Sequence, residues 1–172
     1  GYFFPDTYRI YKDAKLSDVL KKIFANLEKK IPSEMRMKMN KQKTNLFEIL
    51  TMASLIEKEA KGMKDMRMIS DIFWRRNKKN WALQSCASVN YVTGKNTPGI
   101  SGEDQKIDSQ YNTYKYPGLP LGPVGNPGLD AIKAALNPKE NDYWYFMTGK
   151  DGVTRFSTTL NEHNRKVNLY LR

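Results

Sequence analysis

The sequence predicts an α+β fold, in which a helical lobe with a glutamate at a helix end packs on a small, loop-rich β/α lobe with a groove between them. Segments before residue 80 have the spacing of amphipathic helices, whereas both strand patterns lie after residue 140. Helices followed by strands on loops favour α+β over an alternating βαβ sheet. The chain has 172 residues, 40% of them hydrophobic, so we expect one domain over residues 1–172.

The first half of the chain contains three helical patterns, at about 16–30, 45–60 and 63–78. Pro32 separates the first of them from the methionine-rich stretch "MRMKMN". Three methionines in this stretch, at 35, 37 and 39, are typical of gap-filling core or flexible surface rather than of a cofactor site.

After Trp81 the sequence becomes rich in turn residues, which include Gly94, Pro98, Gly99, Gly102 and Pro117. A short helix is predicted at 128–138, followed by a strand at 143–147. The turn "GKDG" leads to a second strand through Arg155 and Phe156, and a final helix is predicted from about residue 161.

The composition limits the functional classes. A net charge of +11, most of it in residues 1–83, makes nucleic acid, anionic lipid and an acidic cell-wall polymer candidate partners. We interpret the basic run at 75–80, "RRNKKN", as a solvated last turn that complements a helix dipole. One cysteine and one histidine exclude an intrachain disulfide and argue against a transition-metal site, so we expect no metal and no cofactor.

No apolar run reaches the roughly 20 residues needed to cross a bilayer, and there is no signal peptide. The chain has no initiator methionine and opens abruptly at "GYFFPDTY". We therefore expect a fragment of a longer protein, whose anchor and preceding domain are missing.

Glu57 is the first unusual feature of the segment "NLFEILTMASLIEKEA" at 45–60. At about 100° per residue it lies only about 20° from Leu46, within an apolar stripe. An ionised carboxylate facing a core costs several kcal/mol unless it is paired, becomes protonated or faces a cleft. Glu59 points the other way, and we expect it to be solvated.

The stretch "YNTYKYPGLPLGPVGNPG" at 111–128 is the second unusual feature. Its four prolines make it stiff, and its tyrosines and asparagines offer flat faces and amide groups suited to a polar ligand such as a sugar. A loop that wraps the core, with tyrosines that only cover it, fits the same residues equally well.

The sequence resembles the endolytic murein transglycosylase family, also called YceG-like, over essentially its whole length. The matching pieces, in chain order, are "GYFFPDTY", "LTMASLIEKEA", "IFWRRN", "LQSCASVNY", "YNTYKYPGLPLGPVGNPG", "AALNP", "YWYFM" and "FSTTLNEHN". The resemblance implies an enzyme that cleaves nascent peptidoglycan glycan strands, with its domain outside the cytoplasmic membrane and a single N-terminal membrane helix as anchor. It also makes peptidoglycan synthases candidate partners.

The resemblance implies that Glu57 is the catalytic residue. One carboxyl group can protonate the glycosidic oxygen and later accept a proton from the C6 hydroxyl of N-acetylmuramic acid, which closes a 1,6-anhydro ring without water. Residues that match family motif positions and are expected to bind substrate are Gln84, Ser85, Asn112, Tyr114 and Asn126. His163 also matches, and we expect it to support the site from behind.

Two of the departures from the family pattern replace a polar residue. Cys86 stands where an aspartate is usual, and Thr154 where a histidine is usual. A non-catalytic peptidoglycan-binding scaffold is therefore one alternative. The net charge and the aromatic residues make a basic nucleic-acid-binding module the other, although no nucleic-acid-binding signature is present and we expect no nucleic-acid partner. A pyridoxal-phosphate lyase would need a phosphate-binding loop, which the sequence lacks.

Overall fold

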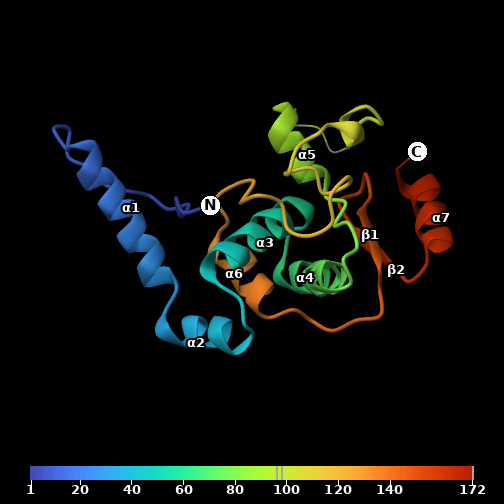
Figure 1. The fold of residues 1–172 in the computed structure, drawn as a ribbon, viewed down its shortest axis with the longest axis horizontal. Coiled ribbons are helices and arrows are strands. Elements are labelled where there is room, and N and C mark those ends of the chain that lie inside the picture. The colour runs from blue at the N-terminus through green and yellow to red at the C-terminus, as the bar shows by residue number, and fades with distance from the viewer. Residues whose placement is uncertain (96, 98, 172) are drawn as a thin grey trace.

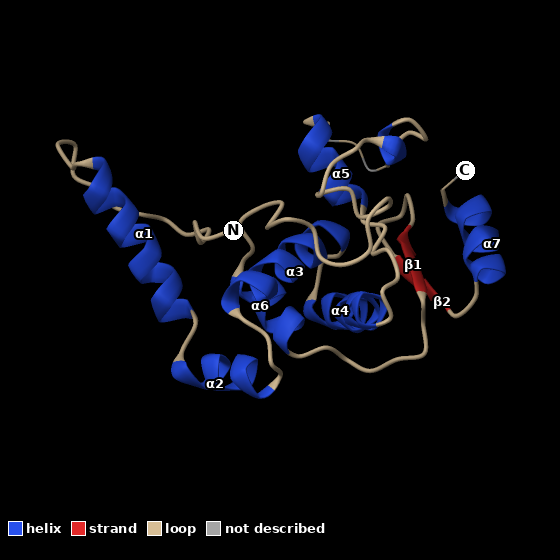
Figure 2. Cartoon of the chain, in the orientation of Figure 1, coloured by secondary structure: helices blue, strands red, loops and turns tan. Residues whose placement is uncertain are grey.

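The computed structural model describes residues 1–95, 97 and 99–171, and this part of the chain is α+β, as predicted. Its elements are shown in Figures 1 and 2, helices packed beside one small sheet. They are α1 (Leu16–Lys30), α2 (Ser33–Lys41), α3 (Leu46–Glu59), α4 (Met63–Lys78), α5 (Cys86–Thr93), a 3₁₀-helix η1 (Asp104–Lys106), α6 (Leu129–Leu136), β1 (Tyr145–Thr148), β2 (Thr154–Ser157) and α7 (Leu160–Tyr170).

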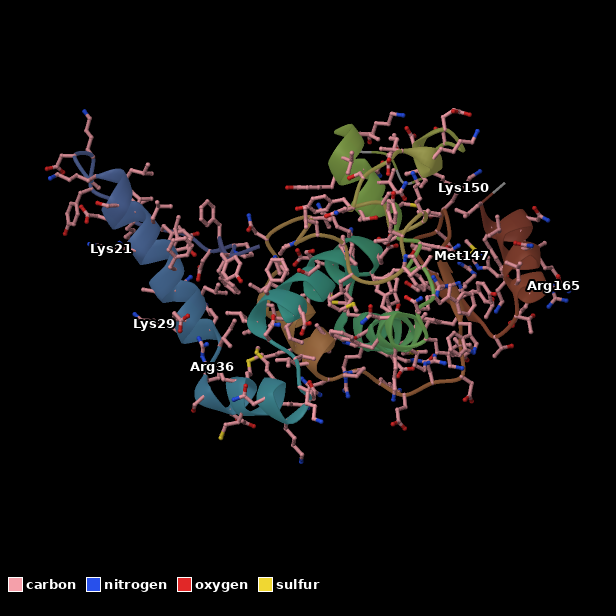
Figure 3. The ribbon with its side chains drawn as sticks, viewed as in Figure 1. Lys21, Lys29, Arg36, Met147, Lys150 and Arg165 are labelled. Carbon is pink, nitrogen blue, oxygen red and sulfur yellow. The ribbon has the colours of Figure 1, made fainter. Side chains whose placement is uncertain are left out.

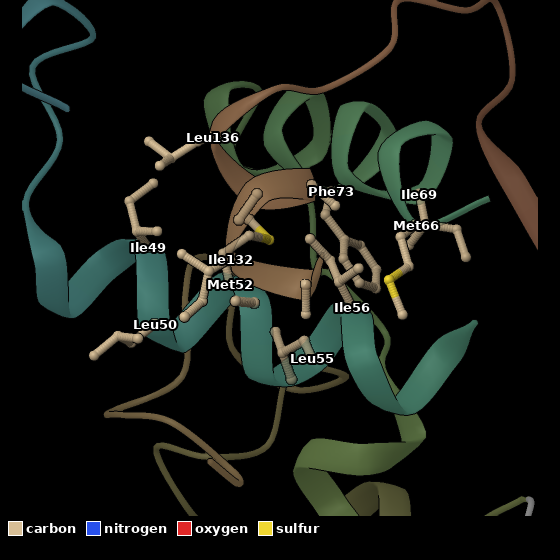
Figure 4. Close-up of a cluster of buried hydrophobic side chains, with 14 of the residues drawn as sticks. Ile49, Leu50, Met52, Leu55, Ile56, Met66, Ile69, Phe73, Ile132 and Leu136 are labelled. Carbon is tan, nitrogen blue, oxygen red and sulfur yellow. The ribbon is translucent and has the colours of Figure 1, made fainter. Parts of the chain in front are cut away.

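The hydrophobic core forms where α3, α4 and α6 pack against one another (Figure 4). Every residue of α3 from Ile49 to Ile56 is buried, so this helix has no solvent side over two turns. Ile69 and Phe73 of α4 and Ile132 of α6 complete the contact with no exposed area. The two-lobe expectation supposed that the helical core is formed by the early segments alone. Because α6 comes from the later half of the chain, the core instead contains both early and late segments.

The ends of α3 are fixed by local chemistry. Asn45 accepts a hydrogen bond from the N–H of Glu48, whose carboxylate accepts one from the N–H of Asn45, so a complete capping box starts the helix. The chain turns extended at Ala60 and reaches a φ of +91° at Gly62, a conformation that favours glycine. The last turn of α3, from Ile56 to Glu59, therefore emerges at the edge of the core.

The sheet is a short antiparallel hairpin. Tyr145 pairs with Ser157 and Thr148 with Thr154, and α7 packs on both strands. No residue of α7 is buried, although Thr159 caps its first turn. A helix with so little buried surface leaves part of its apolar face open.

The long helices at 16–30, 45–60 and 63–78 are confirmed within one residue, and the final helix begins at Leu160. Two short helices, α2 and α5, were not predicted. The sequence "CASVNYVT" of α5 contains weak helix formers, and burial of Ser88 and Val89 stabilises it instead. Gly94 ends it with a φ of +71°, whereas Pro98 lies outside the described residues.

Helix α1 extends away from the rest of the molecule, and only Leu27 of this helix is buried (Figure 1). Figure 3 shows Lys21 and Lys29 on α1 and Arg165 on α7, at opposite ends of the molecule, so basic side chains are spread over distant surfaces. In the described part of the chain, no helix combines the length and the apolar character that crossing a membrane requires.

Candidate active site

A cavity of about 720 Å³ lies where the last turn of α3 meets the β1–β2 hairpin and one face of α7. Leu160, Val167 and Leu171 give this cavity an apolar wall. Its principal polar residues come from six segments of the chain: Glu57, Glu59, Arg76, Gln84, Tyr114, Tyr145 and His163.

Glu59 is half-buried at the edge of this cavity. The Ser85 hydroxyl, itself buried, donates a hydrogen bond to Glu59 Oε1. Burial raises the pKa of the Glu59 carboxyl above its ordinary value of 4.5, while the Ser85 hydrogen bond and the positive charge of Arg76 act in the opposite direction. A carboxyl group in this setting holds its proton at a higher pH than an exposed glutamate does.

The expectation that Glu59 is solvated is therefore wrong. It assumed that α3 has one apolar face and one solvent face, whereas the helix is buried on all sides as far as Ile56. The side of α3 away from Glu57 faces Ser85 and Arg76, so a carboxylate there enters the cavity instead of water.

Glu57 also lines the cavity, and its carboxylate is engaged by the start of α6. The backbone N–H of Gly128 donates to Glu57 Oε1 at 2.8 Å, directly before the first residue of α6. A helix N-terminus has unpaired N–H groups that interact favourably with a carboxylate. A Cβ atom at Gly128 would lie 3.2 Å from Glu57 Oε1, so glycine permits this close approach. The contact joins α3 to α6.

Arg76 is the buried cation of the site, with an exposed fraction of only 4%. Its guanidinium donates to the carbonyl oxygens of Leu83 and Trp144, and it lies over the rings of Trp81 and Tyr145 at 5.3 and 5.7 Å from their centroids. Burial lowers its pKa, but a guanidinium remains charged. The interpretation of 75–80 as a solvated basic turn is thus wrong for Arg76.

The segment after Leu83 forms the wall that carries Gln84. Gln84 has a φ of +56° and donates its backbone N–H to Thr113 O at 2.9 Å, and the Ser85 N–H donates to Thr113 Oγ1 at 3.1 Å. Two predicted substrate-binding residues, Gln84 and Tyr114, therefore line the cavity side by side in this wall, whereas Ser85 lies behind them and contacts Glu59.

Cys86 and Tyr114 are hydrogen-bonded to each other across this wall. Their Sγ and Oη atoms are 3.1 Å apart, and burial raises the pKa of both groups. Cys86 is accordingly a neutral thiol in the position where the family pattern has an aspartate.

His163 lines the cavity from α7, and its expected supporting role stays a prediction. Its ring stacks on Tyr145 with centroids 5.6 Å apart, and its Nδ1 atom is buried without a hydrogen-bond partner among the described residues. Burial, followed by the charges of Arg76 and Lys166, lowers the His163 pKa. The imidazole is neutral near pH 7 and contributes shape and polarity instead of charge.

Asn112 and Asn126 are not placed in the cavity lining. The Asn112 side chain is buried and donates to Gln105 O and Ile107 O, while its Oδ1 accepts from Tyr114 N–H, so its amide is occupied in shaping the loop. Asn126 is exposed and accepts a hydrogen bond from the Phe3 N–H. The expected sugar contacts of these two residues have no support in this geometry.

The stiff loop at 111–128 mostly wraps the core. Tyr111 packs on Tyr91 with centroids 4.9 Å apart, and Tyr116 donates to Asp108. The Val124 N–H donates to Ser54 Oγ of α3 at 3.0 Å. Of the two interpretations left open for this loop, the core-wrapping one describes most of it, and Tyr114 alone of its tyrosines reaches the cavity.

Sequence reasoning missed Glu59 and Arg76 as site residues. Arg76 lies seven residues after Ile69 and three after Phe73, on the apolar side of α4, and this spacing could have identified it as buried. Glu59 had no such signal, because its surroundings come from Arg76 and Ser85, 17 and 26 positions further along the chain.

In the part of the chain that the structure describes, no three His, Cys, Asp or Glu side chains are grouped so that they could hold a metal ion. The site combines the carboxyl group of the half-buried Glu59 and the buried guanidinium of Arg76 with polar groups along the cavity wall. These polar groups are the amide of Gln84, the phenol of Tyr114 and the imidazole of His163. These residues define an α+β protein with the features of a general-acid site.

The chain belongs to the YceG-like family, whose sequence profile matches residues 1–169. It is 38% identical over 172 residues to the endolytic murein transglycosylase of Bacillus subtilis (strain 168), which covers 99% of this chain and 48% of that protein. It is 33% identical over 173 residues to the endolytic murein transglycosylase of Streptococcus pneumoniae serotype 2 (strain D39 / NCTC 7466), covering 97% of this chain and 31% of that protein.

Among solved structures, the yceG-like protein lmo1499 from Listeria monocytogenes matches with a TM-score of 0.90 and 38% identity, over 96% of this chain and 54% of that one. The chain thus spans about half the length, or less, of these relatives. The match confirms both the resemblance seen in the sequence and the fold.

Proposed function

We propose that this domain is a lytic transglycosylase that cleaves the bond between N-acetylmuramic acid and N-acetylglucosamine in peptidoglycan strands and leaves 1,6-anhydro ends. The names of the B. subtilis and S. pneumoniae relatives support this class of substrate. The observation that supports general-acid catalysis is the position of Glu59 in the cavity, where burial raises the pKa of its carboxyl group.

The reaction needs one carboxyl group and no cofactor. Glu59 donates its proton to the glycosidic oxygen as the bond from that oxygen to C1 of the muramic acid breaks. The C6 hydroxyl of the same sugar then attacks C1, and its proton passes to the Glu59 carboxylate. The carboxyl group regains its starting form, and no water is consumed.

Two glutamates on α3 are candidates for this acid, and the geometry favours Glu59. The family resemblance points to Glu57, which remains a prediction. Glu57 Oε1 accepts a hydrogen bond from the Gly128 N–H at the start of α6, so it is already engaged in joining α3 to α6. Glu59 has the raised pKa, a hydroxyl partner in Ser85 and a cation in Arg76, as a group that cycles between its two forms requires.

Gln84, Tyr114 and His163 are the remaining polar groups that we assign to substrate contact or to its support. They line the same cavity as Glu59, from the 84–114 wall and from α7. Amide and phenol groups can bind the hydroxyl and N-acetyl groups of a sugar, and the Tyr145 ring, held by His163, offers a flat face.

The test is digestion of purified peptidoglycan, with mass analysis of the fragments. Wild type should give 1,6-anhydro-terminated muropeptides, and Glu59→Gln should lower turnover by about 10³-fold, because Gln keeps the shape but has no proton to donate. Glu57→Gln should retain turnover within about tenfold.

Each other outcome has a distinct meaning. A large loss in Glu57→Gln with an active Glu59→Gln would return the catalytic role to Glu57. Reducing ends would indicate a hydrolase. Binding without cleavage would favour the non-catalytic scaffold, and salt-sensitive nucleic-acid binding that displaces glycan would favour the nucleic-acid module.

We further propose that the domain acts outside the cytoplasmic membrane, near peptidoglycan synthases and held by an anchor in another part of the protein, since that is where glycan strands are polymerised. Protease added to intact spheroplasts should remove this domain. Protection from protease until the cells are lysed would contradict this location.

A further inference from the structure

We propose that Arg76 is a positioning residue for this reaction: it supplies the countercharge for the Glu59 carboxylate and ties together the two walls between which Glu59 works. The proposal rests on the function proposed above, with Glu59 as the acid. It concerns a side chain of α4 that contacts no sugar in the proposed mechanism and acts through other residues.

The first step is the position of the guanidinium. One of its terminal nitrogens, Nη1, donates to Leu83 O at 2.6 Å, next to Gln84 and Ser85, and the other, Nη2, donates to Trp144 O, next to Tyr145. The first wall of the cavity carries the Ser85 hydroxyl that binds Glu59, and the second carries the Tyr145 ring. The Arg76 side chain therefore holds both walls relative to α4, because the two terminal nitrogens of its planar guanidinium donate in different directions.

The second step is the charge balance around Arg76. Its exposed fraction is 4%, its hydrogen-bond partners are neutral carbonyl oxygens, and its Nε atom is buried without a partner among the described residues. A buried cation is costly unless an anion lies near it. Glu59 is the carboxyl group of the cavity whose charge interacts with Arg76.

The other charged or titratable groups at the site do not provide this balance. Glu57 of α3 is engaged by Gly128 N–H. Cys86 of α5 and Tyr114 of the loop are neutral near pH 7 because burial raises the pKa of both groups, and His163 of α7 is neutral because burial lowers its pKa. Lys58 and Lys61, which follow Glu57 in the chain, are exposed cations at the rim.

The third step concerns the reaction. When Glu59 gives its proton to the glycosidic oxygen, a carboxylate appears in a cavity that burial has made unfavourable for it. Arg76 is already fixed and desolvated there, so it stabilises the new charge without reorganisation, which is the kind of interaction that lowers a barrier. Arg76 therefore matters most in the step that leaves Glu59 as a carboxylate, when the two side chains form an ion pair.

The experiment uses Arg76→Gln and Arg76→Lys, with Arg75→Gln as the matched control. Arg75 is the preceding residue of α4 and does not line the cavity. It pairs with Asp71, stacks on the Trp144 ring and donates to Asn141 Oδ1 and Tyr143 O, so its variant controls for loss of a cation and of contacts with the 141–144 segment. The readouts are the Glu59 pKa, from the carboxyl ¹³C signal, and kcat and kcat/KM for peptidoglycan strands as a function of pH. Far-UV circular dichroism checks that each variant is folded.

Arg76→Gln should raise the Glu59 pKa, move the alkaline limb of kcat/KM to higher pH and lower kcat by about 10²-fold to 10³-fold. Arg76→Lys keeps the charge but not the fork, so it should hold the Glu59 pKa nearer to wild type while recovering only part of kcat. Arg75→Gln should leave both the pKa and the pH profile unchanged.

An Arg76→Gln variant that is folded and shows an unshifted Glu59 pKa would overturn the countercharge role. If this variant does not fold, Arg76→Lys decides, because wild-type kcat and a wild-type pH profile in it would overturn the positioning role. The ¹³C titration needs no turnover, so these results are separable from a failure of the proposed function, which would appear as wild-type protein that yields no anhydro products.

Discussion

At the scale of single residues, the two glutamates of α3 show what a sequence pattern can resolve. The pattern identified Glu57 as unusual because its neighbours on the helical wheel are apolar, and the structure does place it at the cavity. The same helical-wheel argument predicted that the Glu59 side chain is exposed to solvent. A wheel describes only one helix, whereas the environment of Glu59 is built by Ser85 and Arg76 from other segments.

The raised pKa of Glu59 predicts a pH-dependent cost to stability. Its folded pKa lies above the unfolded value, so the stabilising contribution of this group is fully present below about pH 4.5 and is lost as pH rises through the folded pKa. Glu59→Gln removes the titration. Thermal midpoints of wild type and Glu59→Gln should therefore be similar at pH 4.5 and separate above it, with the variant becoming the more stable of the two.

Differential scanning calorimetry from pH 4 to pH 8 measures this difference. Glu57→Gln on the same helix is the comparison variant, because the Glu57 side chain is hydrogen-bonded to the Gly128 N–H and not to Ser85. A constant difference between wild type and Glu59→Gln over the whole range would mean that Glu59 has an ordinary pKa.

At the scale of elements, the predictable helices are those whose own sequence specifies them. The capping box of Asn45 and Glu48 and the turn residue Gly62 set limits for α3 that are visible in the sequence. Helices α2 and α5 are only nine and eight residues long, too short for a clear periodic pattern, so their packing against the rest of the protein stabilises them. The wall of the site built from 84–85 and 113–114 depends on hydrogen bonds between distant segments, which no local pattern encodes.

Removing the N-cap of α3 should mainly lower stability, whereas removing the N-cap of α7 should mainly lower turnover. Asn45 caps α3 in the core, so Asn45→Ala should lower the free energy of unfolding by about 1 kcal/mol and leave turnover little changed. Thr159 caps α7, which has no buried residue but forms one wall of the cavity, so Thr159→Ala should fray α7 and reduce turnover with a smaller change in global stability.

Urea unfolding and muropeptide release, measured on both variants, separate these effects. The proposed role of α7 would be contradicted if Thr159→Ala cleaved peptidoglycan at the wild-type rate while hydrogen exchange showed that α7 is frayed.

At the scale of the whole molecule, the sequence predicted the class of fold but not how its halves join. Glu57 and Gly128, 71 positions apart, connect α3 to α6, and the Trp74 indole of α4 donates to Ala135 O of α6 at 2.9 Å. A short apolar helix such as α6 can pack on many surfaces, so its partners could not be read from periodicity. The result is one core shared by early and late segments, with α1 extending from it (Figure 1).

This arrangement predicts one cooperative unit with a weakly protected extension. Backbone amides of α3, α4 and α6 should exchange with solvent only through global unfolding, whereas those of α1, where Leu27 alone is buried, should exchange through local opening.

Ile132→Ala, at a site with no exposed area, should lower the free energy of unfolding by about 2–5 kcal/mol and speed exchange in all three core helices together. Leu16→Ala on α1, where the side chain is 72% exposed, should change it by less than about 0.5 kcal/mol. Hydrogen exchange read by mass spectrometry measures both effects. If Ile132→Ala loosened α6 while α3 and α4 kept their protection, the two halves of the chain would be separate folding units, and the link from Gly128 to Glu57 could not hold the end of α3 in place.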